Sequence, residues 1–269
     1  MLGASLLGDA DRNDLKREAG ACRLPRQREE CELAKSLPDW LAEDVKPVRD
    51  KPVRWLSEQY FFRDPPRPTY SDLSYFFSPA DGVILYQKVV KPDDPMIEIK
   101  GRSYSLQEAI RDFDYDSPSL VIGVFMTFYD VHINRVPYPG RLSYRPLEAI
   151  DTYNHPMLTL ETRLVDELRV SLDDAEYLHY NQRMLNRFDS LELGQSYYVL
   201  QIADYDVDRI VPFEVRQHQP RRQGERFSQI RFGSQVDLIV PLSQRHEFIP
   251  VQEVGSHVEA GIDALIKIR

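Results

Sequence analysis

The chain has 269 residues, of which 42% are hydrophobic and 29% charged, a composition that supplies a core and excludes wholesale disorder. The formal net charge of −9 argues against nucleic-acid binding through phosphate contacts. Two cysteines, Cys22 and Cys31, are too few for a disulfide framework or a cysteine-built zinc site. No segment approaches the roughly 20 apolar residues of a membrane-spanning helix. We therefore expect a cytoplasmic protein that holds no metal.

Residues 1–58 are predicted to form a charged, helical N-terminal region. The segments DRNDLKREAG and REECELAKSL are rich in helix-forming residues and contain no proline. Further along, Trp40 and Trp55 stand in a broken amphipathic pattern beside basic residues. The simpler interpretation is a helical lead-in that packs on the main domain. The alternative is a peripheral contact with a membrane, because tryptophan flanked by basic residues suits a lipid interface.

From residue 59 to residue 269 the sequence indicates many short strands. These are rich in β-branched and aromatic residues and end at Gly, Pro or Asp. They are expected at residues 82–90, 96–101, 119–126, 196–203, 208–215, 234–241 and 246–251. Helices are predicted at 105–113 and 166–185. Because helices do not alternate regularly with strands, we predict an α+β fold with a largely antiparallel β domain.

Three segments carry the candidate site residues. Asp81 stands in the turn-like sequence SPADG, which backbone preferences alone could explain. Asp130, His132 and Asn134 would share one face of a strand, because strand side chains alternate. Gly233-Ser234 lies within an apolar strand pattern, where glycine often marks a bulge or a close backbone approach. A second Gly-Ser pair, at residues 255–256, is interpreted as an ordinary turn.

Taken in order, these segments resemble the phosphatidylserine decarboxylase family of pyruvoyl-dependent enzymes. The resemblance covers residues 59–269 and runs through seven motifs: YFFRDPPRP, SPADG, IKGRSYSLQEAI, FMTFYDVHINRVPYPG, NQRM, VLQIADYDVDRIV and GERFSQIRFGSQVDLIVP. One position departs from the pattern of some members, which have a second histidine three residues after the first. This chain has Arg135 there, as the shorter members of the family do.

The resemblance implies a self-cleaving proenzyme. The serine attacks the carbonyl carbon of the preceding glycine, and the chain breaks between Gly233 and Ser234. Ser234 would become a pyruvoyl group, the prosthetic group of the mature enzyme. The family's assisting Asp-His pair carries over to Asp81 and His132.

The residue types suit this chemistry. A serine hydroxyl is a weak nucleophile until a base removes its proton, and histidine titrates near neutrality. A carboxylate beside the histidine would set its tautomer, and a glycine before the serine leaves its carbonyl unshielded. We therefore expect Asp81, His132 and Ser234 to converge, with His132 within hydrogen-bonding reach of Asp81.

The resemblance also implies the reaction. The pyruvoyl carbonyl forms a Schiff base with the substrate amine and accepts electrons as CO₂ leaves, and His132 is the candidate proton donor. Phosphatidylserine is the default substrate, giving phosphatidylethanolamine. The alternatives are a soluble amino acid such as tryptophan, or an unprocessed scaffold protein. A homodimer is a further expectation, and the segment NHPMLTLETRL is interpreted as a mobile substrate loop.

Overall fold

The computed structural model describes residues 34–67, 71–99, 102–147, 155–204, 210–214, 216–231 and 233–269. All of this part belongs to one compact unit, Glu32–Arg269. Both cysteines and most of the two helical segments predicted before residue 38 lie outside the described residues, and residues 34–36 of the second segment are not helical. None of the helices described is long and apolar enough to cross a membrane.

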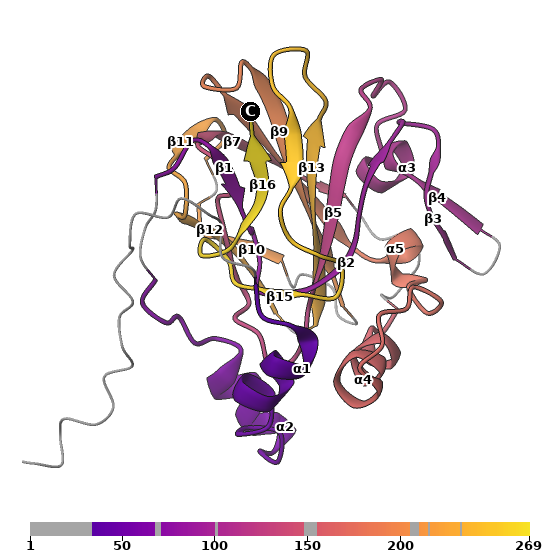
Figure 1. Ribbon diagram of the computed structural model, residues 1–269, viewed down its shortest axis with the longest axis vertical. Coiled ribbons are helices and arrows are strands. Elements are labelled where there is room, and N and C mark those ends of the chain that lie inside the picture. The colour runs from indigo at the N-terminus through magenta and orange to yellow at the C-terminus, as the bar shows by residue number, and fades with distance from the viewer. Residues whose placement is uncertain are drawn as a thin grey trace, which may run out of the picture. The chain divides into compact units, whose positions relative to one another are not determined.

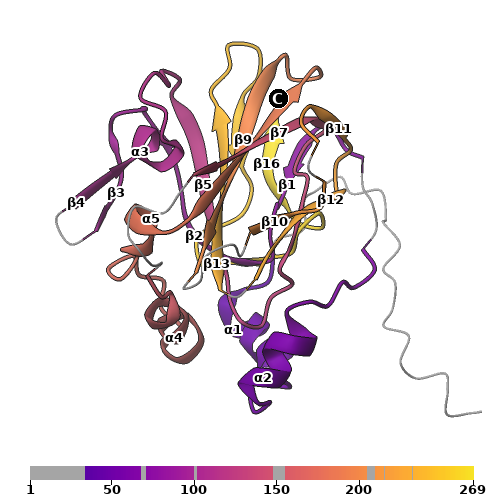
Figure 2. The same cartoon turned by 180° about the vertical axis from the view of Figure 1, so that it is seen from behind.

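An eight-stranded antiparallel sheet forms the centre of the unit (Figures 1 and 2). Its strands, in spatial order, are β11 (Gln219–Arg221), β7 (Gly140–Leu147), β8 (Arg183–Ser190), β9 (Gln195–Ala203), β13 (Ser234–Pro241), β5 (Ser119–Met126), β2 (Gly82–Val90) and β15 (His257–Val258). Every pairing in the sheet is antiparallel, which confirms the predicted fold class.

Three smaller sheets accompany the large sheet in the described part of the chain. The first contains β1 (Tyr75–Phe77), β16 (Ala264–Ile268) and β14 (Phe248–Pro250). The second contains β10 (Ile210–Pro212), β12 (Arg226–Ile230) and β6 (Ile133–Arg135). The third is the pair of β3 (Pro95–Ile99) and β4 (Arg102–Ser105). The first two sheets cover one face of the large sheet, and helices cover the other (Figures 1 and 2).

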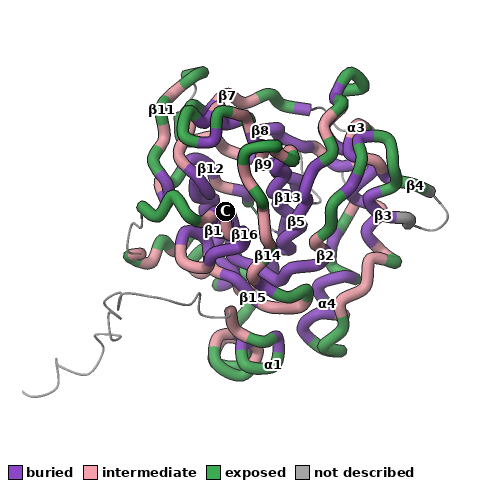
Figure 3. Tube along the Cα trace, turned by 45° about the horizontal axis from the view of Figure 1, so that its top comes forward, coloured by how far each residue is buried: buried purple, intermediate pink, exposed green. Residues whose placement is uncertain are grey.

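Both faces of the central strands β5 and β13 are therefore buried, whereas β7 is partly exposed, as the tube coloured by burial shows (Figure 3). Every residue of β5 is buried, so this central strand is a continuous apolar run rather than an alternating one. Along β13, Val236 and Leu238 enter the core cluster on the side of the small sheets, and Ile239 enters the cluster on the helical side. Each such aliphatic side chain contributes about 1.5–3 kcal/mol on burial.

The lead-in consists of four short helical segments, α1 (Leu37–Trp40), η1 (Leu41–Val45), α2 (Val53–Trp55) and η2 (Leu56–Tyr60). Ser36 caps α1 through its side chain. Trp40 and Val45 are each 1% exposed, so the lead-in packs on the sheet domain, which confirms the simpler interpretation. The prediction that Trp40 contributes to a membrane-contacting surface is wrong, because its ring is buried. Trp55, in contrast, is 36% exposed.

Two helix predictions have different outcomes. Within the range 105–113, where a helix is predicted, the chain forms α3 (Leu106–Ile110). Ser105 and Glu108 form a capping box at its N-terminus. The prediction of one helix over residues 166–185 is wrong. Leu168 adopts a left-handed conformation that ends the preceding helix, only α5 (Tyr177–Tyr180) forms, and residues 183–185 belong to β8.

The predicted mobile loop is also wrong for most of its length. Residues 158–164 of this segment lie in α4 (Leu158–Glu167). Leu160 and Leu164, one helical turn apart, are buried against the sheet domain. A helix with a buried apolar stripe is a fixed part of the core rather than a loop.

Candidate active site

Three neighbouring strands bring the SPADG turn and the Gly-Ser pair to one end of the large sheet. β13 begins at Ser234, which pairs with Met126 at the end of β5. β2 lies on the other side of β5 and begins at Gly82, directly after Asp81. A Cβ on Gly82 would lie 2.0 Å from the carbonyl oxygen of Phe125, so only glycine permits this approach. The turn therefore has a packing reason for its glycine.

Ser234 is completely buried, and its Oγ donates a hydrogen bond to Met126 Sδ at 3.2 Å. Gly233 lies in the connection between β12 and β13, not inside a strand as its sequence context predicts. A Cβ at Gly233 would come within 2.9 Å of Asp204 Oδ2. The connection thus passes directly against the Asp204 carboxylate, which would have to shift to admit a side chain at this position.

His132 lies in the turn that follows β5. Its Nε2 donates to the carbonyl oxygen of Thr127 at 2.9 Å. Because a carbonyl only accepts, the proton of a neutral ring lies on Nε2, and Nδ1 carries the lone pair. In the described part of the chain this buried Nδ1 has no hydrogen-bond partner. Burial lowers the pKa of His132 below 6.5, which keeps the ring neutral and basic near pH 7.

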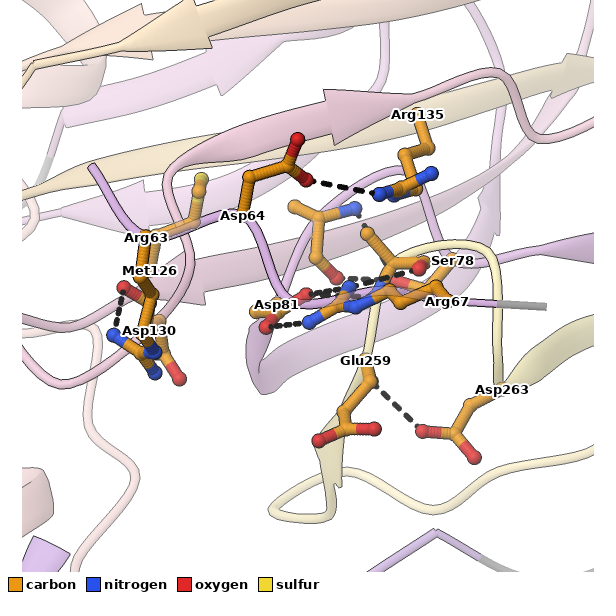
Figure 4. Close-up of polar contacts among 12 residues, drawn as sticks. Arg63, Asp64, Arg67, Ser78, Asp81, Met126, Asp130, Arg135, Glu259 and Asp263 are labelled. Carbon is orange, nitrogen blue, oxygen red and sulfur yellow. Dashed lines mark hydrogen bonds and ion pairs between the residues drawn. The ribbon is translucent and has the colours of Figure 1, made fainter. Parts of the chain in front are cut away.

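Asp81 does not form the predicted hydrogen bond with His132. Arg67 instead donates to both of its carboxylate oxygens at 2.6 Å, and Ala260 N adds a bond of 2.8 Å (Figure 4). Both side chains of the Arg67–Asp81 pair are at most 6% exposed. The guanidinium matches a carboxylate in two places at once, so it satisfies Asp81 more completely than an imidazole could. Asp81 acts on His132 only through its charge, which raises the pKa of the imidazole against the larger effect of burial.

A second buried carboxylate, Asp130, lies in the same turn as His132. Its Oδ2 accepts from Thr127 N and Thr127 Oγ1, both at 2.7 Å. Its Oδ1 accepts from His257 Nε2 at 2.6 Å. The prediction that Asp130, His132 and Asn134 share one strand face is wrong, because β6 begins only at Ile133. Sequence reasoning gave His257 no role, and no local signal marks it.

Asn134 connects the turn at Pro79 with Met126. Its Nδ2 donates to the carbonyl of Pro79 at 3.3 Å and to Met126 Sδ at 3.7 Å. Gln201 Nε2 donates to Asn134 Oδ1 at 2.7 Å. Asn134 therefore contacts the same sulfur atom as Ser234.

A buried network on the opposite face of β13 holds the start of this strand. Gln235 accepts from Tyr177 at 2.6 Å and donates to Tyr86 and Asp237 at 2.8 and 2.6 Å. Tyr86 also donates to Asp237, at 2.8 Å. Burial raises the pKa of Asp237 to about 6, although the hydrogen bonds from Gln235 and Tyr86 oppose this shift. Sequence reasoning missed the network, because its members come from distant elements.

A cavity of about 800 Å³ lies beside the segment that carries Arg67. Its charged lining comprises four arginines and three acids, Arg67, Arg135, Arg221, Arg226, Asp64, Glu214 and Glu225. Arg135 and Arg226 share Asp64 as an ion-pair partner. Burial lowers the pKa of Arg135, and the charges of Arg67 and Arg226 lower it further. The charges of Asp64 and Asp81 oppose this shift.

Comparison with known families matches residues 58–265 to the family described as phosphatidylserine decarboxylase. The phosphatidylserine decarboxylase proenzyme of Paramagnetospirillum magneticum is 32% identical, over 75% of this chain and 68% of the relative. That of Erythrobacter litoralis is 33% identical, over 77% of this chain and 72% of the relative. A putative archaetidylserine decarboxylase proenzyme of Methanothermobacter thermautotrophicus is 33% identical, over 67% and 69%.

Proposed function

Because the chain belongs to the phosphatidylserine decarboxylase family, we propose that it is a self-processing decarboxylase that converts phosphatidylserine to phosphatidylethanolamine and CO₂. One observation carries the self-processing. A buried Ser234 directly follows Gly233 at the start of β13, and the adjoining turn holds a neutral histidine with an unpartnered Nδ1. The relatives are named proenzymes, which supports the same conclusion.

In the proposed cleavage, His132 Nδ1 accepts the proton of Ser234 Oγ, which attacks the carbonyl carbon of Gly233. The hydroxyl must first turn away from Met126 Sδ, its partner in the intact chain. The C–N bond then breaks, the Ser234 nitrogen takes up a proton, and an ester replaces the amide. A general base of this kind accelerates such a step by about 10²–10⁴.

The chain separates by elimination. Ser234 loses its Cα proton, its Cβ–Oγ bond breaks, and Gly233 leaves as a carboxylate. Hydrolysis of the dehydroalanine end releases ammonia and leaves a pyruvoyl group. When formed, this group supplies the electron sink for decarboxylation. The residues present fit it, because Ser234 lies in a fully buried position that excludes bulk water. His132 would hold at Nδ1 the proton that returns to the substrate carbon.

The arginine-lined cavity supports an anionic substrate. Phosphatidylserine presents a phosphate and a carboxylate, and guanidinium groups bind both through paired hydrogen bonds. Free tryptophan lacks the phosphate, and the relatives are named for phosphatidylserine, which supports the phospholipid as the substrate.

A denaturing gel of purified protein tests the self-processing. We expect two pieces, residues 1–233 and 234–269, with the smaller one labelled by a carbonyl-reactive hydrazide. Ser234→Ala should remain intact, because no nucleophile is left. Ser256→Ala, in the other Gly-Ser pair, is the matched control and should cleave normally. A wild-type protein found only at full length, without hydrazide labelling, would contradict the proposal.

The substrate is tested by CO₂ release from phosphatidylserine in detergent micelles, with free tryptophan as the competitor. We expect turnover of the phospholipid only. Arg226→Met should raise KM for the phospholipid several-fold and leave kcat unchanged, since Arg226 lines the cavity, where its side chain pairs with Asp64. Turnover of tryptophan alone would refute the phospholipid assignment and leave the self-processing intact.

A further inference from the structure

We infer that the buried Asp130–His257 pair is a positioning device for self-cleavage: acting through Thr127, it holds His132 in the tautomer whose Nδ1 can accept the Ser234 proton. The inference rests on the proposed function, because it concerns the base of the cleavage step. It gives a role to His257, which lies outside all the sequence motifs of the site.

The first link joins Asp130 to His132 through a single residue. Thr127 donates both its backbone N–H and its hydroxyl to Asp130 Oδ2. The carbonyl of Thr127 accepts from Asp130 N at 3.1 Å and from His132 Nε2 at 2.9 Å. Thr127 is thus held from both sides, and its carbonyl fixes which nitrogen of His132 carries the proton. Any rotation of Thr127 would free His132 to adopt the other tautomer.

The second link is the ion pair itself. Asp130 and His257 are 2% and 5% exposed at their side chains. A buried carboxylate is costly unless it is paired and hydrogen-bonded, and His257 supplies the charge that Asp130 needs. His257 lies on β15, which joins the edge of the large sheet beside β2. The ion pair therefore ties the turn after β5 to the far end of the chain.

The third link consists of contacts from the N-terminal lead-in to His257 and to the turn that carries Asp130. Trp40 stacks on the His257 ring with centroids 4.6 Å apart and planes 12° apart. The carbonyl of Lys35 accepts from the backbone N–H of His257 at 2.9 Å. Arg63, just after η2, donates to the carbonyls of Tyr129 and Asp130. The lead-in thus holds both His257 and the turn, which explains why Trp40 is buried.

The arrangement differs from the Asp-His pair that the family resemblance implies. Asp81 is fully occupied by Arg67 and cannot orient His132 by direct contact. Asp130 provides the orientation indirectly, through the backbone of Thr127. Asp130 and His257 touch neither Ser234 nor Gly233, so they are positioning residues rather than catalytic ones.

Two measurements on the full-length chain test the inference. The first follows cleavage after cell-free synthesis of the wild type, His257→Ala, His257→Gln and Asp130→Asn. We expect His257→Ala and Asp130→Asn to slow cleavage by about 10- to 100-fold, less than loss of the base itself. His257→Gln should recover part of the rate, because its amide can still donate to Asp130. His246→Gln, outside this network, is the control and should cleave at the wild-type rate.

The second measurement records the ¹⁵N signals of the His132 ring in the uncleaved Ser234→Ala protein. We expect the Nε2–H tautomer there, and a mixture of tautomers when His257→Ala or Asp130→Asn is added. A variant that merely unfolds would be recognised by loss of cooperative melting, and His257→Gln then serves in its place.

The outcomes separate the two proposals. If the wild type cleaves, and the Asp130 and His257 variants cleave equally fast with an unchanged tautomer signal, the positioning role is refuted while the proposed function stands. If the wild type does not cleave, the proposed function fails, and the tautomer signal alone decides whether the pair orients His132.

Discussion

Asp81 and Asp130 are two buried carboxylates of the candidate site, and each is paired with a different kind of cation. Asp81 binds Arg67 through both oxygens, and Asp130 binds His257 through one. Burial alone would lower the pKa of each cation, but the neighbouring carboxylate outweighs burial and raises it. Arginine stays charged at every accessible pH, whereas histidine does not. The charge of Arg67 is therefore constant, whereas the turn that carries His132 is held most firmly when His257 is protonated.

The largest expected effect is on the Asp81 side. Arg67→Met leaves Asp81 buried without its cation, and breaking a buried pair costs about 3–5 kcal/mol. Urea unfolding of the uncleaved Ser234→Ala protein would measure the loss. Arg226→Met is the matched control, because its side chain is 54% exposed and should cost at most about 1 kcal/mol. Equal losses for the two variants would contradict the importance of the buried pair.

A third buried carboxylate sharpens the comparison, because Asp237 forms no salt bridge within the described residues. Its pKa rises from 3.8 to about 6. A raised acid pKa means that stability is lost as the pH rises through about 6. Asp237→Asn should therefore stabilise the protein by up to about 3 kcal/mol at pH 8, with little gain at pH 4. Unfolding curves at the two pH values measure this, and a loss at pH 8 would count against it.

The Asp130–His257 pair should lose stability at both ends of the pH range. The raised pKa of His257 gives stability that is complete below pH 6.5 and lost as the pH rises through the folded value. The lowered pKa of Asp130 gives stability that is lost as the pH falls below about 3.8. His257→Gln should thus cost about 1–3 kcal/mol between pH 4 and 6.5 and less at pH 9. The Arg67→Met cost should stay constant over the alkaline part of this range, and a parallel decline in both would refute the distinction.

The smallest expected effect concerns the ring that covers His257. Trp40→Phe keeps an aromatic surface but leaves a gap, at a cost of about 1–2 kcal/mol. Trp55→Phe is the matched control, since Trp55 is 36% exposed and should change stability by less than about 0.5 kcal/mol. Thermal unfolding of the two variants would show the difference. Indistinguishable melting curves would mean that the stack on His257 contributes nothing.

Local sequence patterns predicted the parts of the fold that depend on local physics. The runs of β-branched and apolar residues at 82–90, 119–126 and 234–241 match β2, β5 and β13 residue for residue. β5 and β13 are buried on both faces, so continuous apolar runs identify them, whereas β2 is exposed at Lys88 and Val89. The helix predicted over residues 166–185 failed because its helix formers were overruled by pairing, and residues 183–185 joined β7 and β9 in the sheet.

The site divides in the same way. The sequence by itself determined which residues are candidates: the Gly233-Ser234 pair, the turn before β2 and the histidine after β5. Each lies within a short contiguous motif, so no tertiary contact is needed to find it. Only the tertiary structure decided which cation each carboxylate receives. Asp130 and His257 are 127 residues apart in sequence and meet because β15 pairs with β2, two strands from β13. Strand order in a sheet is settled by the packing of the whole chain, and no local pattern records it.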